Sequence, residues 1–325
     1  MRAYIVGAGA VGTYLGGLLS ASGASVAYAP RSLDDVVPVE ADCAIVTVKS
    51  YDTGSAIETL RRALPNTAST AIVCPQNGVG NEEKLAAAFG ADAVVACALT
   101  VPVDRTRDGR SVAASEGGLA LAPVGTQAHN WLIAAFERSG LTVTVVSDYR
   151  ALKWSKLMLN MVANAACAIL NVLPERLVRM DGVFTLEIRA LREARAVMSG
   201  LGLTPIDLPR YPVRALQAIA SLPSPLARLV LANRVAGARG RKPPSLLLDL
   251  RAAKGRTEVD VLNGAVAAAG SALGIRTPVN AVYARVLNDI AHMPQLWAKY
   301  RERPEALQAE VEAEKGRLRA SRRHV

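Results

Sequence analysis

The sequence is poor in the residues that build metal and disulfide sites. Of its 325 residues only three are histidine and four are cysteine, and no two cysteines form a CxxC pair. Each cysteine has apolar neighbours, which predicts small core residues rather than metal ligands or disulfide partners at Cys43, Cys74, Cys97 and Cys167. We therefore expect a cytoplasmic protein without a metal site.

Aromatic residues are also scarce, at 4% of the chain, although half of all residues are hydrophobic. The core must then be built mainly from Ala, Val and Leu. Charged residues make up a fifth, which is typical of an ordered globular protein. A chain of this length is too long for one compact core and suits two domains.

The second half of the chain has few acids for its many bases. Residues 150–325 hold 28 Lys and Arg and 14 Asp and Glu, a net charge of +14, whereas residues 1–149 hold 10 and 14, a net charge of −4. Basic surfaces attract small anions, nucleic acids or membranes. Nucleic-acid binding by stacking needs aromatic residues, so small anions are favoured. An acidic partner or a nucleic acid held by this half and the tail Lys315–Arg323 stays open as an alternative.

The N-terminal segment suits either a secretory signal or a nucleotide-binding turn. It begins with a basic residue and an apolar run, as signal peptides do. Its glycines, however, follow a short β-branched run in the spacing GxGxxG. A signal peptide has no use for that spacing. We therefore expect a dinucleotide-binding turn, with cofactor contacts from Gly7, Ala8, Gly9, Ala10, Val11 and Gly12.

Each glycine has its own physical role in such a turn. Gly7 permits the turn, Gly9 lets a pyrophosphate approach the backbone, and Gly12 lets helix and strand pack closely. The anion then meets unpaired N–H groups at the start of the helix. The pattern predicts a strand, a helix and a second strand at Ala3–Val6, Ala10–Ala21 and Ser25–Ala29.

No acid stands where the second strand ends. The ribose 2′-hydroxyl of NAD is usually held by an Asp or Glu about 20 residues past the glycines. Here Arg31 and Ser32 occupy that place, and the first acid is Asp34. Because Arg31 and Ser32 can bind a 2′-phosphate, NADPH is favoured over NADH, with an ordinary surface arginine as the alternative.

Apolar strands and amphipathic helices go on alternating as far as Ser147–Arg150, where the strand pattern ends. Ligands of parallel sheets bind at the carboxyl ends of the strands. Lys49 and Asn77 follow two such ends and are expected to meet cofactor phosphate and ribose or nicotinamide. We predict an α/β fold with a Rossmann-type doubly wound parallel sheet in an NADP-binding domain (residues 1–149), followed by an all-helical substrate-binding domain (residues 150–325). Further strands are expected at Ala44–Val48, Thr70–Cys74, Val94–Val101, Leu119–Ala122 and Thr142–Val146, and helices at Thr53–Leu64, Asn81–Phe89 and Ala128–Arg138.

Leu157–Pro174 carries no charge at all. It is long enough to raise a membrane-spanning helix, but three asparagines and a terminal proline argue against one. On a continuous helix, polar side chains project within one narrow stripe. A solvated stripe would be richer in Glu, Lys and Arg. The stripe therefore predicts the wall of a substrate cleft, and a half-buried polar stripe without a binding role is the alternative. Its members are Lys153, Lys156, Asn160, Asn164 and Asn171.

The chemistry of this stripe suits an acid substrate. Asparagine supplies both donors and acceptors, so Asn160 and Asn164 can hold a carboxylate and a hydroxyl without adding charge. Lys156 would be partly desolvated there and able to give up a proton. Further on, Pro243, Pro244 and Ser245 resemble a loop entering a helix.

Five segments, in one order, resemble the ketopantoate reductase (2-dehydropantoate 2-reductase) family over nearly the whole chain. Each is common alone, but the combination is specific. They are the glycine turn, the strand ending at Lys49, Gln76-Asn77-Gly78, the Trp154–Asn164 segment, and Arg256-Thr257-Glu258 with the Leu262-Asn263-Gly264 that follows.

The resemblance implies NADPH as reductant and reduction of a branched 2-keto acid, with 2-dehydropantoate as first candidate, to a D-2-hydroxy acid. It implies that Lys156 donates a proton to the keto oxygen and that Glu258 meets the cofactor near the nicotinamide. Substrate contacts are implied for Asn160, Asn164 and Ser245, and NADP contacts for Arg31, Lys49 and Asn77. No metal or membrane partner is implied, and a homodimer is left open.

The chain departs from the family pattern in several places. Only 17 residues separate Arg31 from Lys49, about half the usual number. Glu175 and Lys242 stand where the family has asparagines, and one extra residue lies between Asp249 and Glu258. We therefore expect a rebuilt pocket, and a non-catalytic dinucleotide-binding sensor of the same fold is the alternative function.

Overall fold

The computed structural model describes residues 1–65, 69–106, 108–239 and 242–320, which form two compact units. Unit 1 comprises Met1–Lys156 with Ile206–Pro212, and unit 2 comprises Leu157–Pro205 with the chain from Val213 onward. The expected domain boundary after residue 149 stays a prediction, because compactness alone does not show that a part folds independently. Residues 321–323 of the basic tail Lys315–Arg323 lie outside the described residues.

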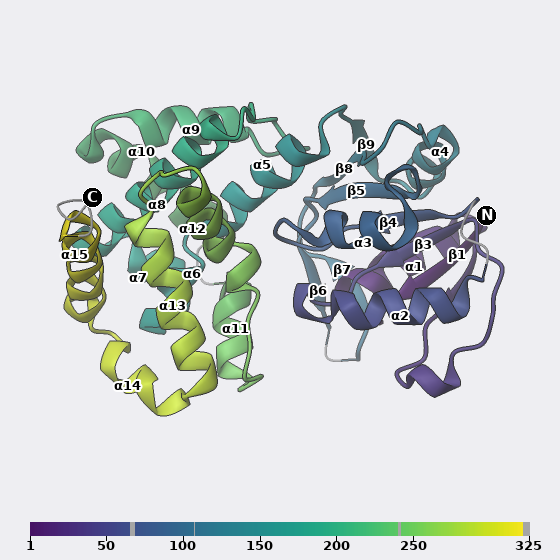
Figure 1. The fold of residues 1–325 in the computed structure, drawn as a ribbon, viewed down its shortest axis with the longest axis horizontal. Coiled ribbons are helices and arrows are strands. Elements are labelled where there is room, and N and C mark those ends of the chain that lie inside the picture. The colour runs from purple at the N-terminus through teal and green to yellow at the C-terminus, as the bar shows by residue number, and fades with distance from the viewer. Residues whose placement is uncertain (66–68, 107, 240–241, 321–325) are drawn as a thin grey trace. The chain divides into compact units, whose positions relative to one another are not determined.

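Unit 1 is built on a seven-stranded sheet in the order β2-β1-β3-β4-β5-β8-β9 (Figure 1). Neighbours are parallel from β2 to β5; β8 then runs antiparallel to β5, and β9 is parallel to β8. The predicted fold class is confirmed, with the last two strands reversed. The strands are β1 (Arg2–Val6), β2 (Ser25–Tyr28), β3 (Cys43–Val46), β4 (Ala71–Cys74), β5 (Val94–Leu99), β8 (Gly118–Pro123) and β9 (Thr142–Val145).

Helices cover both faces of this sheet. On one face α1 (Ala10–Ala21) and α4 (Asn130–Arg138) bury Leu15 and Phe136 against Ile5 and its neighbours. On the other, α2 (Thr53–Ala63) and α3 (Asn81–Phe89) bury Leu60 and Leu85. Covering both faces explains why the central strands are apolar throughout. Three short 3₁₀ helices complete the layers: η1 (Leu33–Asp35), η2 (Ser50–Asp52) and η3 (Ala91–Ala93).

The sequence did not predict the small hairpin of β6 (Val103–Arg105) and β7 (Ser111–Ala113). Its strands are only three residues long, too short to show a period-two apolar pattern. The hairpin packs on α1, where the hydroxyls of Thr13 and Ser111 lie 2.5 Å apart. An element missed from sequence thus lies beside the helix of the glycine turn.

Unit 2 is entirely helical among the residues that the structure describes. α5 (Tyr149–Met161) belongs to unit 1 as far as Lys156 and to unit 2 beyond it. The other helices are α6 (Ala165–Leu170), α7 (Pro174–Leu177), α8 (Asp181–Gly200), α9 (Val213–Ser221), α10 (Ser224–Arg239), α11 (Ser245–Arg251), η4 (Val259–Val261), α12 (Asn263–Ala272), α13 (Pro278–His292), η5 (Pro294–Leu296), α14 (Trp297–Tyr300) and α15 (Pro304–Ala320).

The predicted continuous helix over Leu157–Pro174 is wrong. α5 ends at Met161 and α6 begins after Asn164, with Ala163 in the left-handed region at φ 49°. The carboxylate of Glu187 on α8 accepts a 2.6 Å hydrogen bond from the Ala163 N–H, which stabilises the break. The single polar stripe that a continuous helix would present therefore does not exist.

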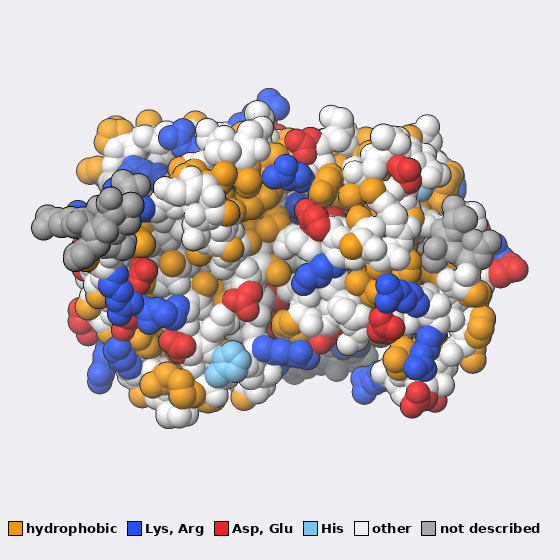
Figure 2. All heavy atoms as spheres, in the orientation of Figure 1, with side chains coloured by type: hydrophobic (Ala, Val, Ile, Leu, Met, Phe, Trp, Pro, Cys, Tyr) orange, Lys and Arg blue, Asp and Glu red, His pale blue; other side chains and the backbone are white. Residues whose placement is uncertain are grey.

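No described helix is long and apolar enough to cross a membrane. Within the same residues, no group of three or more His, Cys, Asp and Glu side chains is placed to hold a metal ion. On the face drawn in Figure 2, basic and acidic side chains are interspersed rather than gathered into one large patch of a single sign. A solvated mixed surface accounts for much of the charge on that face.

Glu310 on α15 joins three side chains of unit 2. Its carboxylate accepts hydrogen bonds from Lys299 at 2.6 Å, Arg285 at 2.8 Å and Tyr300 at 3.1 Å. Chiefly through the Lys299 and Arg285 bonds, the pKa of Glu310 falls from 4.5 to about 2. A carboxyl whose pKa is lower in the folded state stabilises the fold above its unfolded pKa and loses that stabilisation as pH falls.

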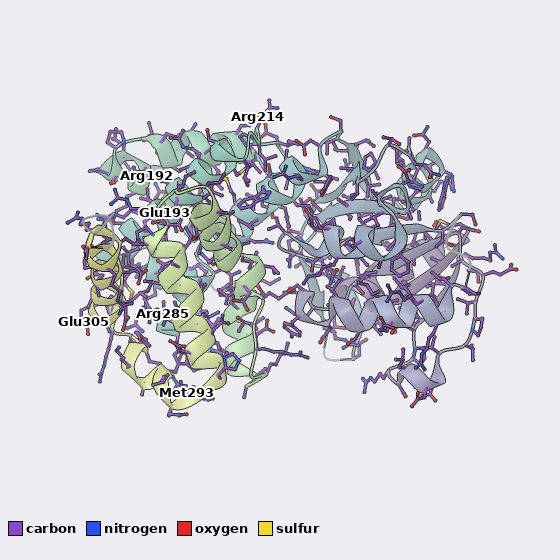
Figure 3. All side chains as sticks on the ribbon, in the orientation of Figure 1. Arg192, Glu193, Arg214, Arg285, Met293 and Glu305 are labelled. Atoms are coloured by element: carbon purple, nitrogen blue, oxygen red, sulfur yellow. The ribbon has the colours of Figure 1, made fainter. Side chains whose placement is uncertain are left out.

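We expect Glu310→Gln to lower the free energy of unfolding by about 1–2 kcal/mol near neutral pH, after discounting for the exposed Lys299 and Arg285. The deficit should shrink between about pH 4.5 and pH 2, because the wild-type carboxyl becomes protonated there. Urea denaturation followed by circular dichroism measures it. Glu305→Gln, at the exposed position labelled in Figure 3, is the control. A deficit that stays constant down to pH 2 would contradict this account.

Candidate active site

The glycine turn between β1 and α1 has space for a Cβ atom at Gly9 but not at Gly7 or Gly12. Gly7 has φ 113°, a conformation that favours glycine. A Cβ atom at Gly12 would overlap the Gly7 carbonyl oxygen, so helix and strand pack as closely as the backbone allows. A Cβ at Gly9 would meet no atom within 4 Å. The turn therefore has open space at the start of α1, where a pyrophosphate would bind.

The end of β3 closes against this turn. The Thr47 hydroxyl donates a 2.6 Å hydrogen bond to the Gly7 carbonyl oxygen, and the Thr47 N–H bonds the Val6 carbonyl. Lys49 follows two residues later and precedes η2. The turn and the residues just before Lys49 are thus joined at one edge of the sheet.

Arg31 follows β2 and is exposed. In the part of the chain that the structure describes, no hydrogen bond or ion pair holds its guanidinium. The neighbouring Ser32 hydroxyl instead accepts a bond from the Asp34 N–H and caps η1. Of the two residues expected to meet a 2′-phosphate, Arg31 is the one whose side chain is not committed to local structure.

A buried ion pair lies beneath the loop that carries Asn77. Lys153 of α5 and Glu82 of α3 are 2% and 1% exposed, and Lys153 Nζ lies 2.8 Å from Glu82 Oε1. The Lys153 ammonium also donates to the backbone carbonyls of Gln76 and Cys97. Burial is the largest single effect and lowers the pKa of Lys153, but the Glu82 carboxylate together with Cys74 and Cys97 outweighs it, so that the pKa is raised. The lysine stays charged and fixes α5 to the loop.

Gln76 extends this network to the next strand. Its side-chain amide donates to the Val48 carbonyl at 3.0 Å and to the Thr53 hydroxyl at 2.9 Å. Asn81, at the start of α3, donates to the Asn77 carbonyl. Val48 and Gln76, which immediately precede Lys49 and Asn77, are therefore joined by a hydrogen bond, and the bond from Lys153 to Gln76 connects both loops to α5.

We expect Lys153→Met to destabilise unit 1 by about 3–5 kcal/mol, because it leaves the Glu82 carboxylate buried without a partner. A second change, Glu82→Leu, removes that carboxylate and should restore at least half of the loss. Urea denaturation measures both variants. Lys84→Met, at an exposed position of α3, is the matched control and should change stability by less than about 0.5 kcal/mol. Equal losses in the single and double variants would contradict a paired role.

Lys156 lies one turn beyond Lys153 on α5 and is half-buried. Burial raises the pKa of the Cys97 thiol on β5 to about 12, and the charges of Lys153 and Lys156 act against that rise. The Ser155 hydroxyl accepts a 2.9 Å bond from the Ile206 N–H, which anchors α5 further. Lys156 is thus carried by a helix that is held on two sides within unit 1.

In unit 2, three predicted substrate residues lie together. The Asn164 side-chain amide donates to the Asn160 carbonyl at 2.9 Å and lies 3.4 Å from the Ser245 hydroxyl. Its oxygen accepts from the Leu246 N–H in the first turn of α11. Asn164 is 4% exposed and its side chain is occupied by these bonds. It positions Ser245 rather than offering a free amide, whereas Asn160 is half-buried.

Two family models match the chain: "Ketopantoate reductase PanE/ApbA" over residues 27–125 and "Ketopantoate reductase PanE/ApbA C terminal" over residues 148–291. The 2-dehydropantoate 2-reductase of Halobacterium salinarum is 30% identical over 266 residues, covering 81% of this chain and 78% of the relative. The chain belongs to the ketopantoate reductase family.

Other ketopantoate reductases agree. The 2-dehydropantoate 2-reductase of Pyrobaculum aerophilum is 29% identical over 294 residues, which cover 85% of this chain and 93% of the relative. A PanE/ApbA family ketopantoate reductase from Ralstonia eutropha JMP134, known from its crystal structure, has a TM-score of 0.75 at 28% identity, covering 91% of this chain and all of that one. The predicted family is confirmed, and the chain is an oxidoreductase.

The remaining predicted residues of this ketopantoate reductase family member occupy different surroundings. Glu258 is 5% exposed and precedes η4 in unit 2. Glu175 lies in the first turn of α7, and Lys242 is exposed. Two residues assigned to the polar stripe lie elsewhere. Lys153 is buried in the ion pair of unit 1, and Asn171 caps the C-terminal end of α6.

Sequence reasoning missed Glu82, Gln76 and Thr53 as members of the site's framework. Glu82 stands in the run Asn81-Glu82-Glu83-Lys84, which is typical of an exposed helix start. The one available signal was Lys153, a lysine in an otherwise apolar turn of α5, since a buried lysine requires a partner.

Proposed function

We propose that this protein reduces a branched 2-keto acid, with 2-dehydropantoate as first candidate, to the D-2-hydroxy acid at the expense of NADPH. The observation that carries the proposal is the buried network of unit 1. It holds the loops of Lys49 and Asn77 and, through Lys153, the helix of Lys156 on one framework. Such a framework would keep a proton donor in fixed register with a bound cofactor.

The chain offers groups that fit a dinucleotide. The open space at Gly9 and the N–H groups at the start of α1 would bind the pyrophosphate, and Arg31 would bind the 2′-phosphate. Lys49 would contact a cofactor phosphate, and Asn77 would contact the ribose or the nicotinamide. Glu258 would contact the cofactor near the nicotinamide. NADPH, when bound, supplies the hydride.

The chain's own residues would then complete the reaction. Lys156 would donate its proton to the keto oxygen as negative charge develops there. Asn160 and the Ser245 hydroxyl would hold the substrate carboxylate, and Asn164 would keep Ser245 in place through the bonds described above. Neutral donors suit a carboxylate because they add no charge that competes with Lys156.

The test is loss of NADPH absorbance across a panel of 2-keto acids that includes 2-dehydropantoate, 2-ketoisovalerate and pyruvate. Branched acids should be reduced faster than pyruvate. Tight NADPH binding without turnover of any member would contradict reduction and support the dinucleotide sensor instead.

Arg31→Ala should weaken NADPH binding about tenfold and leave NADH binding unchanged, because it removes one charge-assisted contact that only the 2′-phosphate would make. The Michaelis constants for the two cofactors measure this. Arg61→Ala, at an exposed α2 position paired with Glu58, is the control. An equal change for both cofactors would show that Arg31 does not read the 2′-phosphate.

A further inference from the structure

A cavity of about 200 Å³ lies in unit 2 at the C-terminal end of α11. Loops that follow α11 and α13 form it, close to Met293, which Figure 3 labels. Its apolar wall is made by Leu250, Ile290, Ala291, Pro294 and Trp297. The volume suits a ligand of about ten non-hydrogen atoms rather than a dinucleotide.

Cationic side chains line the same cavity. They come from two separate parts of the chain: Arg251, Lys254 and Arg256 from the end of α11 and the segment after it, and Arg301 from the end of α14. Among the lining residues that the structure describes, the one carboxylate is Asp249, which binds Lys254 at 2.6 Å. The lining therefore carries an excess of positive charge.

Two of these cations are held by neutral groups. Arg251 donates from Nε and Nη2 to the side-chain oxygen of Asn171, at 3.0 and 2.9 Å. The Arg301 guanidinium lies 4.2 Å from the centre of the Trp297 ring. Asparagine and tryptophan orient the guanidinium groups without neutralising them, and Asn171 takes only two of the five N–H donors of Arg251. The charges are thus fixed in place and uncompensated by these partners.

A purely structural role explains part of this arrangement. Arg251 lies in the last turn of α11, where a cation stabilises the helix carbonyls. Arg301, however, comes from a different element, and an apolar wall beside fixed cations is not needed to end a helix. We propose that the cavity binds a small organic anion, a monocarboxylate with a branched or aromatic body, whose apolar part packs on Pro294 and the accessible edge of Trp297.

This cavity is separate from the predicted substrate residues of the same unit. α6 and α11 run side by side, joined at one end by Asn164 with Ser245 and at the other by Asn171 with Arg251. The cavity adjoins the second end. The seven residues of α11 rise about 10 Å, so Ser245 lies roughly that far from Arg251.

Trp297 makes the site observable in the full-length protein. Titration with sodium benzoate should quench tryptophan fluorescence saturably, with a dissociation constant of about a millimolar. Calorimetry should give the same constant. Trp297→Phe should remove the fluorescence change while calorimetric binding persists. No saturable binding up to tens of millimolar would overturn the proposal.

Variants and probes locate the binding. Arg251→Gln and Arg301→Gln, both at exposed positions, should each weaken benzoate binding about tenfold, whereas Arg276→Gln, an exposed arginine outside the cavity, should not. Inorganic phosphate and benzyl alcohol should bind more weakly than benzoate, because phosphate has no apolar body and benzyl alcohol has no negative charge. Equal binding of phosphate, or unchanged binding in both arginine variants, would overturn the proposal.

The benzoate test does not depend on the proposed reduction, because it measures anion binding and not turnover. Asn160→Ala, which alters the predicted substrate residues, should leave benzoate binding unchanged. If that variant abolished binding while Arg251→Gln did not, the anion would belong to the substrate residues and the cavity would carry no site.

Discussion

Replacing Lys156 with alanine is expected to reduce turnover of the 2-keto acid by about 10²–10⁴-fold while NADPH still binds. This is the range that a positioned proton donor contributes. Lys156 is half-buried on a helix that Lys153 and Ser155 anchor within unit 1, so its removal should leave the fold intact. Single-turnover kinetics with NADPH measures the rate of keto-acid reduction, and fluorescence titration measures cofactor binding.

Lys156→Arg separates charge from proton transfer. Arginine keeps the positive charge but does not release its proton at any working pH. Turnover should therefore stay within about tenfold of the alanine variant. Lys84→Ala, an exposed lysine of α3, is the control for a general loss of positive charge. Near-normal turnover in Lys156→Ala would falsify the role of Lys156 as proton donor.

The glycine turn yields the second large effect. Gly12→Ala would bring a Cβ into the Gly7 carbonyl oxygen and within 2.5 Å of the Thr47 hydroxyl. Both obstacles are part of a packed strand–helix junction, so the turn must open. We expect unit 1 to lose about 3 kcal/mol or more of stability and the protein to lose measurable NADPH binding. Thermal unfolding and calorimetric titration measure the two effects.

Gly9→Ala should act on the cofactor and spare the fold. Its Cβ would meet no protein atom within 4 Å, so stability should change by no more than about 1 kcal/mol, but the methyl group would fill the space left for the pyrophosphate. NADPH binding should fall at least about tenfold. Gly17→Ala, equally unobstructed in the middle of α1, is the matched control. The same loss of binding at Gly17 would show that helix propensity, not the phosphate space, is responsible.

Local sequence pattern predicted much of unit 1. α1 and α3 have the same bounds as predicted, because each has a clear start and lies between strands with β-branched residues. The separate roles expected for Gly7 and Gly12 also follow from spacing alone. The reversal of β8 was not predicted, since an apolar run such as Leu119–Ala122 has the same composition in either direction.

The surroundings of residues that contact distant parts of the chain could not be predicted from local sequence pattern. Lys153 and Lys156 fall on one helical face, yet Lys153 is buried because Glu82, 71 residues earlier in the chain, lies against it. The break after Met161 has neither proline nor glycine to mark it and depends on the Glu187 carboxylate. Asn171 was assigned to the same polar stripe, but it binds Arg251 instead. In each case a tertiary contact overrides the local pattern.

The short segment between Arg31 and Lys49 has a practical consequence for protein engineers. It is tethered at the surface, by Arg62 to the Leu33 carbonyl and by Arg2 to Glu40 and Asp42. Among described residues, the Lys153–Glu82–Gln76 bonds draw no donor or acceptor from residues 32–47. We expect that a longer loop grafted there from a relative would change the preference between the two pyridine nucleotides and leave the Lys153–Glu82–Gln76 bonds in place.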